Sequence, residues 1–181
     1  MSAQSPAVPG TGARWVVPVV ALGIFLLWLA SVELAQAARP SAELHTVALF
    51  VHLAALVAGF GAVLVIDWIG LLWALGRRTF FDVTHTADAV HVVIWGSLLA
   101  LVASGIFLEP DTATVLTRIK LALVLVIALN GLHAHALQPQ LVPHRDTPPS
   151  PGLLARAGVT AALSQLCWWA AMIIGFCNTQ T

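Results

Sequence analysis

The chain has 181 residues, of which 59% are hydrophobic and only 9% are charged. A soluble globular domain carries about 25% charged residues, so this chain has too little polar surface to cover a water-soluble globule. Its eight basic and eight acidic residues balance, which gives no indication of a nucleic-acid partner. The composition predicts an all-α integral membrane protein surrounded by the lipid bilayer.

Five apolar segments are each long enough to cross a membrane core of about 30 Å, which takes about 20 helical residues. They span roughly residues 15–37, 45–75, 88–108, 115–137 and 153–176. Polar or proline-containing stretches separate them, and the longest of these is QPQLVPHRDTPPSPG at 138–152. Residues 1–13 have the composition of a disordered tail. We therefore expect one transmembrane domain at 14–181, folded as a five-helix bundle.

The first segment has two interpretations. Arg14, the apolar run and the small residues AQA at 35–37 resemble a secretory signal peptide with its cleavage site. The length of the apolar run favours a retained helix instead. The basic residues then predict the topology, because cytoplasmic loops carry an excess of lysine and arginine. An N-terminus in the cytoplasm places five basic residues inside (Arg14, Arg77, Arg78, Arg145 and Arg156) and three outside (Arg39, Arg118 and Lys120).

Polar residues within the apolar segments are the candidates for function, since ionisable side chains inside a membrane are costly and usually face the bundle interior. His45 and His52 lie seven residues apart, so they share one face of the second helix. Arg118 and Lys120 begin the fourth helix at the same, outer end of the bundle. The sequence thus predicts a basic, histidine-containing site near the outer surface.

A second group falls toward the inner surface: Asp67, Asp88, His91, Asn130, His133 and His135. We expect Asp67 to be a proton relay or a buried hydrogen-bonding partner of the inner histidines, of Trp68, of Trp95 or of Asn130. Asn130 and His133 share a face, whereas His133 and His135 point about 160° apart. At most one of these two histidines can face the same neighbouring helix as Asn130.

Histidines at helical spacing in a bundle suit two chemistries. One is haem b, with His52 as an axial ligand and Lys120 or Arg118 near the propionates. The other is a copper path that uses His45, His52, His91 and His133. Sulfur ligands are scarce, because only Met172 and two cysteines accompany the initiator methionine. This scarcity favours haem over copper.

Three segments resemble a known superfamily. HLAALVAGFGAVLV at 52–65 has an early histidine followed by G-x-G, and HVVIWGSLLALVASGIFLEPD at 91–111 ends its helix with SG and an acidic turn. LTRIKLALVLVIALNGLHAHAL at 116–137 begins with R-x-K-L and closes with N-G-L-H. Together they are similar to small membrane bundles that include the copper-resistance-D-like proteins and the haem-binding membrane protoporphyrinogen oxidases of bacteria. The resemblance covers about residues 44–137.

The resemblance implies functional residues. In the oxidase branch an early helical histidine and a lysine in a K-L helix start form the functional pair, and by motif they correspond to His52 and Lys120. The chain differs from that branch in lacking its tyrosine–histidine pair, since it contains no tyrosine.

We therefore expect a b-type haem protein with an electron-transfer or oxidoreductase role in a bacterial-type inner membrane. Copper transport is the alternative. A further alternative is a structural subunit, either in a homo-oligomer or in a larger membrane complex.

Overall fold

The computed structural model describes residues 13–144 and 149–178. Over these ranges the chain folds into five long helices, with two short 3₁₀ helices between them. The long helices are α1 (Ala13–Ala37), α2 (Ala42–Ala74), α3 (Phe80–Gly105), α4 (Val115–Leu141) and α5 (Pro151–Asn178), and the short ones are η1 (Ile106–Leu108) and η2 (Val142–His144). Each long helix has the length and hydropathy to cross a membrane. The protein is an all-α, multi-pass membrane protein, as its composition predicted.

The connection between α2 and α3 is shorter than expected, and local hydrogen bonds explain why. Gly76 adopts a φ of 70°, and the amides of Gly76 and Arg77 donate to the carbonyls of Trp73 and Leu72. These are the two bonds of a Schellman motif, which ends α2. Three residues after Gly76, Thr79 caps α3 through a reciprocal pair of hydrogen bonds with Asp82.

The predicted helix bounds are corrected in three places. The helix expected from residue 88 begins at Phe80, because the Thr79 capping box starts it within the polar stretch. The fourth helix continues past residue 137 and includes Pro139. The fifth begins at Pro151, a residue whose fixed φ suits the first helical turn. The expected tail lies outside the described residues except for Ala13, which belongs to α1.

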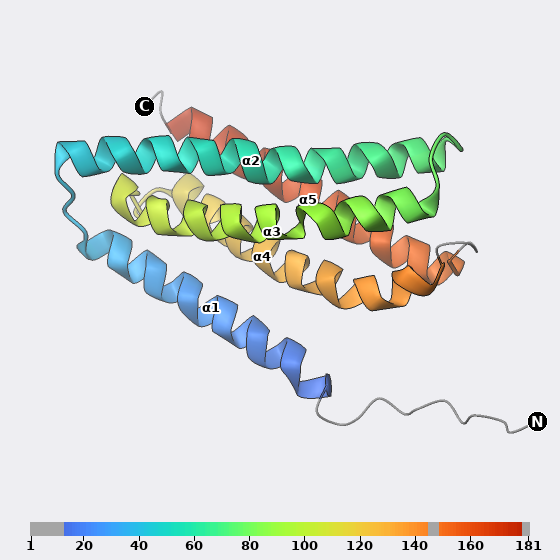
Figure 1. Ribbon diagram of the computed structural model, residues 1–181. Coiled ribbons are helices and arrows are strands. Elements are labelled where there is room, and N and C mark those ends of the chain that lie inside the picture. The colour runs from blue at the N-terminus through green and yellow to red at the C-terminus, as the bar shows by residue number, and fades with distance from the viewer. Residues whose placement is uncertain (1–12, 145–148, 179–181) are drawn as a thin grey trace, which may run out of the picture.

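The five helices form two antiparallel pairs and a peripheral helix (Figure 1). α2 packs along α3, α4 packs along α5, and α1 lies at the side, where it touches α4 and η1. The core that joins the two pairs contains Phe60 of α2, Leu101 of α3, Ile127 of α4 and Trp168 of α5. The alternating direction of the helices brings the start of α2, the end of α3, the start of α4 and the end of α5 to one end of the bundle.

The outer faces of the helices remain apolar. Val57 and Val92 are 75% and 77% exposed, and Phe50 is 73% exposed. In water such a surface would drive aggregation, whereas in a bilayer it contacts acyl chains as apolar as itself. The apolar exterior and the lengths of the helices both indicate that the helices lie in a lipid bilayer.

Candidate functional site

His52 projects from α2 toward the inside of the bundle. Ala48 and Ala55 are buried four residues before and three residues after it, and Gly59 is buried seven residues after it. These positions repeat at helical spacing, so they define the interior face of α2. Gly105 of α3 approaches the imidazole so closely that an added Cβ would lie 3.8 Å from its Cε1 atom. His52 is therefore a partly buried residue of the α2–α3 interface.

The hydrogen bonds of Ser104 favour one tautomer of His52. The Nδ1 atom of His52 lies 3.0 Å from the Ser104 Oγ atom. Ser104 has a single hydroxyl proton, and its Oγ atom lies 2.6 Å from the Ala100 carbonyl oxygen, which can only accept. The Ser104 hydroxyl donates to that carbonyl and accepts from the His52 ring. This arrangement favours the tautomer of His52 that carries its proton on Nδ1 and has its lone pair on Nε2.

Lys120 lies in the second turn of α4, at the same end of the bundle as His52. Its side chain is partly buried, and no described residue hydrogen-bonds to it or pairs with its charge. Among the described residues no buried side-chain nitrogen lacks a hydrogen-bond partner, so the ammonium group of Lys120 reaches the surface of the protein while its stem is partly buried. His52 and Lys120 are thus two basic side chains at the same end of the bundle, on helices α2 and α4 that do not pack directly against each other.

The other two residues predicted for this end of the bundle do not join that pair. Arg118 is exposed, and its guanidinium donates to the Ala113 carbonyl at 3.2 Å. It lies two residues before Lys120, which places the two side chains on opposite sides of α4. His45 lies on the His52 face two turns away; its backbone amide donates to the Ser41 carbonyl, and its side chain makes no hydrogen bond with the described part of the chain.

At the opposite end of the bundle, His91 of α3 stacks on His135 of α4. Their ring centroids lie 4.7 Å apart with an interplanar angle of 27°. One turn before His91, Asp88 accepts a hydrogen bond of 3.1 Å from the Gln138 amide of α4. The sequence predicts His133, rather than His135, as the α4 residue of the inner metal path. The contact with His91 instead comes from the histidine on the far side of α4.

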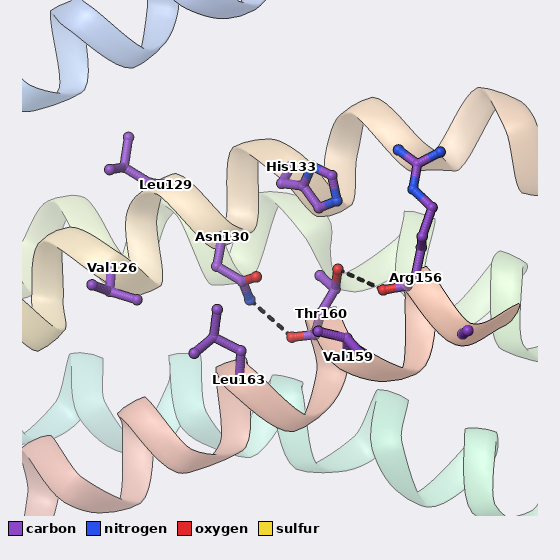
Figure 2. A pocket seen from close by; sticks show the side chains of 9 residues that line it. Val126, Leu129, Asn130, His133, Arg156, Val159, Thr160 and Leu163 are labelled. Carbon is purple, nitrogen blue, oxygen red and sulfur yellow. Dashed lines mark hydrogen bonds between the residues drawn. The ribbon is translucent and has the colours of Figure 1, made fainter. Parts of the chain in front are cut away.

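Asn130 and His133 share a face of α4, as expected, and that face is turned toward α5. The Asn130 amide donates to the Thr160 carbonyl at 2.9 Å. Both side chains line a groove of about 560 Å³ between α4 and α5 (Figure 2). This groove lies at the end of the bundle away from His52, so it is separate from the His52–Lys120 site.

Asp67 has a partner that the sequence analysis did not name. Its carboxylate accepts a hydrogen bond of 2.5 Å from the side-chain NH₂ group of Gln165 in α5. The side-chain carbonyl of Gln165 in turn accepts a hydrogen bond of 3.0 Å from the Trp169 indole. The expected contacts with Asn130 and with the inner histidines are not formed, because Asn130 bonds to Thr160 and the α2 face at Asp67 is directed at α5. In the sequence, the one indication of this partner is the polar residue Gln165 midway along the apolar segment 153–176.

The four histidines proposed as metal ligands do not converge. His45 and His52 lie at one end of the bundle, whereas His91 and His133 lie at the other, on different helix faces. Within residues 13–144 and 149–178, no three histidine, cysteine, aspartate or glutamate residues are close enough to hold one metal ion. The arrangement supplies single imidazole ligands rather than a chelating cluster.

Comparisons with protein-family models, with curated protein sequences and with solved structures give no match to this chain.

Proposed function

We propose that the protein is a membrane b-type haem protein with an electron-transfer or oxidoreductase role. The observation that carries the proposal is the contact of 3.0 Å between the Nδ1 atom of His52 and the Ser104 Oγ atom, which favours the tautomer that leaves the Nε2 lone pair available to a metal. Histidines that bind metals commonly donate their other ring N–H to a second group, which orients the ring and raises its basicity. His52 has this arrangement within the bundle.

Lys120 supports the same proposal. A haem carries two propionate carboxylates, which pair well with basic side chains. Lys120 is partly buried at the same end of the bundle as His52, without an anionic partner among the described residues, so a propionate would satisfy its charge. When bound, the haem iron supplies one-electron oxidation and reduction. The chain would contribute an axial imidazole from His52 and a counter-charge from Lys120.

A second axial ligand for the haem iron would have to come from a residue that does not neighbour His52 within the same protomer. His45 lies on the same helix face as His52, and two ligands on one helix face cannot bracket one iron. We propose that His45 of a second protomer is the candidate, which would require a homo-oligomer or a larger complex. A haem bound through His52 alone would instead leave one coordination position open.

The charges at the two ends of the bundle support an N-terminus in the cytoplasm. Arg77 and Arg78 follow α2, and Arg156 lies in the second turn of α5, so these arginines share the end at which α1 begins. Arg39, Arg118 and Lys120 belong to the opposite end. Arg14, in the first turn of α1, brings the first end to four basic residues against three, which favours it as the cytoplasmic one in a bacterial-type inner membrane.

Haem titration of the purified apoprotein tests the proposal. We expect a saturable absorbance change for the wild type, and about tenfold weaker binding for Lys120→Met, since charge-assisted pairs contribute about 1.5–3 kcal/mol. Arg118→Gln is the matched control, because Arg118 is exposed and faces away from the site. An affinity that is the same in all three proteins, or that falls equally in both variants, would contradict the proposed role of Lys120.

A further inference from the structure

The groove between α4 and α5 combines basic, polar and apolar residues in a particular order. Its nine lining residues are Val126, Leu129, Asn130, His133, Ala155, Arg156, Val159, Thr160 and Leu163. We propose that this groove binds one anionic phospholipid from the leaflet that surrounds the start of α5. The proposal concerns a different site from the one assigned to haem and does not depend on it.

The order of the residues along the groove matches the order of groups in a phospholipid. Arg156 and His133 lie together at one end, and Val126 and Leu163 lie toward the other (Figure 2). In each helix the basic and apolar members are seven residues apart, which is about 10 Å. Arg156 is in the second turn of α5, so the basic end is at the membrane surface. A phosphate would lie there, and an acyl chain would follow the apolar end toward the bilayer centre.

The charge at the basic end is unmatched. The Arg156 side chain is exposed and makes no hydrogen bond or ion pair with a described residue. No acidic side chain is among the residues that line the groove. The planar guanidinium can donate two parallel hydrogen bonds to a phosphate. Basic pockets between transmembrane helices are recognised sites for anionic lipid headgroups.

The polar wall of the groove is already held in place by the protein. Asn130 donates to the Thr160 carbonyl, and the Thr160 hydroxyl donates to the Arg156 carbonyl at 2.9 Å. The Asn130 bond links α4 to α5 beneath the basic end and sets the separation of the two walls, while the Thr160 hydroxyl bond lies within α5. The groove therefore exists before a lipid enters, and binding does not require the helices to move apart.

Native mass spectrometry of the full-length protein in detergent tests the proposal with two probes of equal acyl composition. These are dioleoyl-phosphatidylglycerol, which is anionic, and dioleoyl-phosphatidylcholine, which has no net charge. We expect the wild type to retain about fivefold more of the anionic lipid, the effect of one interfacial charge. Arg156→Gln should lose this preference and retain the two lipids equally.

Arg77→Gln is the matched control, because Arg77 is an exposed arginine at the same end of the bundle but outside the groove. It should retain the preference of the wild type. Val159→Trp provides a second variant, which keeps Arg156 and fills the apolar part of the groove. It should reduce retention of the anionic lipid severalfold without altering the helical content measured by circular dichroism.

Three results would overturn the proposal. Equal retention of both lipids by the wild type would show that the groove does not select anionic headgroups. Equal loss of the anionic lipid in Arg77→Gln and Arg156→Gln would assign the preference to general surface charge. Full displacement of the lipid by an equal concentration of inorganic phosphate would show a site for free phosphate instead.

Discussion

Gly59 has the closest neighbour of the glycines in the described residues, and it marks where α2 and α3 come together. A Cβ added at this position would lie 2.7 Å from the Ser97 Cβ atom and 3.4 Å from the Trp168 ring. Gly61, two residues along the same helix, has no such neighbour within 4 Å. Small residues at helix interfaces let backbones approach closely in membranes. The two glycines of this G-x-G therefore have different roles.

Gly59→Ala should destabilise the protein, because the added methyl group overpacks the contact with Ser97 at a cost of about 1–3 kcal/mol. The gain of about 1 kcal/mol from replacing a helical glycine by alanine offsets part of this cost, which leaves a net destabilisation of up to about 2 kcal/mol. Gly61→Ala should show only that gain. Thermal melting in detergent, followed by circular dichroism, measures both. A melting temperature for Gly59→Ala at or above that of the wild type would contradict the close packing.

The hydrogen bond between Asp67 and Gln165 joins α2 to α5 within the membrane. Gln165→Leu should destabilise the protein by about 1–3 kcal/mol, because it leaves a partly buried carboxyl group without its donor. The double variant Asp67→Leu with Gln165→Leu should recover the part of that loss that comes from the unpaired carboxyl group, whereas the exposed Trp169 indole loses its acceptor in both variants. Chemical or thermal unfolding of the four proteins of this double-mutant cycle gives the coupling energy, and strictly additive effects would contradict the bond.

Residue types and spacing predicted that His52 lies inside the bundle and that Asn130 and His133 share a face. They did not predict Ser104, Gln165 or His135 as partners. Each of these contacts depends on the rotation of one helix relative to another, which hydrophobic periodicity defines poorly when a helix is apolar on all sides. Helices in lipid lack the clear division between polar and apolar faces that fixes such rotations in soluble proteins.

At the scale of the helices, the start of α3 shows how a short polar motif overrides composition. The stretch GRRTFFDVTHTAD at 76–88 is rich in charged and hydroxyl residues, and we expected a loop there. The structure instead has helix from Phe80 onward, capped by Thr79 and Asp82. The T-x-x-D spacing is a variant of the capping box, with aspartate in place of glutamate. In the sequence, this motif indicates that α3 begins at Phe80.

Thr79→Ala should weaken the start of α3 by about 1 kcal/mol, because the amide of Asp82 loses the threonine hydroxyl that accepts its hydrogen bond. The effect should be local. Hydrogen–deuterium exchange should show faster exchange in the first turn of α3 and unchanged exchange near Ser104. Thr79→Ser serves as the control, since it retains the hydroxyl. Equal exchange in the alanine and serine variants would show that the cap contributes nothing.

α1 is attached to the bundle by few contacts, and Trp28 provides a specific one. Its indole donates to the Leu121 carbonyl of α4 at 3.0 Å, one residue beyond Lys120. Trp28→Phe should speed hydrogen exchange along α1, because the inter-helix hydrogen bond is lost while most of the packing remains. Trp15→Phe is the matched control, since Trp15 is 72% exposed. Equal exchange in both variants would contradict a role for Trp28 in holding α1.

At the scale of the whole molecule, the fold followed from the sequence more directly than the candidate site did. Five apolar segments of sufficient length leave few alternatives, because a chain inside a bilayer must satisfy its backbone groups within helices or closed barrels. Their order and short connections then give antiparallel neighbours. The site depends instead on which helices pair: the strong α2–α3 contact creates the His52–Ser104 bond, whereas the α4–α5 contact creates a groove that no single helix contains.

The central claim is that His52 binds haem through Nε2. The most direct test is an absorption spectrum of the detergent-purified protein, oxidised and then reduced with dithionite, beside the spectra of His52→Ala and His45→Ala. The proteins are expressed with ample haem. We predict a Soret band that shifts on reduction in the wild type, is lost in His52→Ala and is retained in His45→Ala if haem binds within one protomer. A wild-type preparation without visible absorbance, or a Soret band unchanged in His52→Ala, would contradict the account.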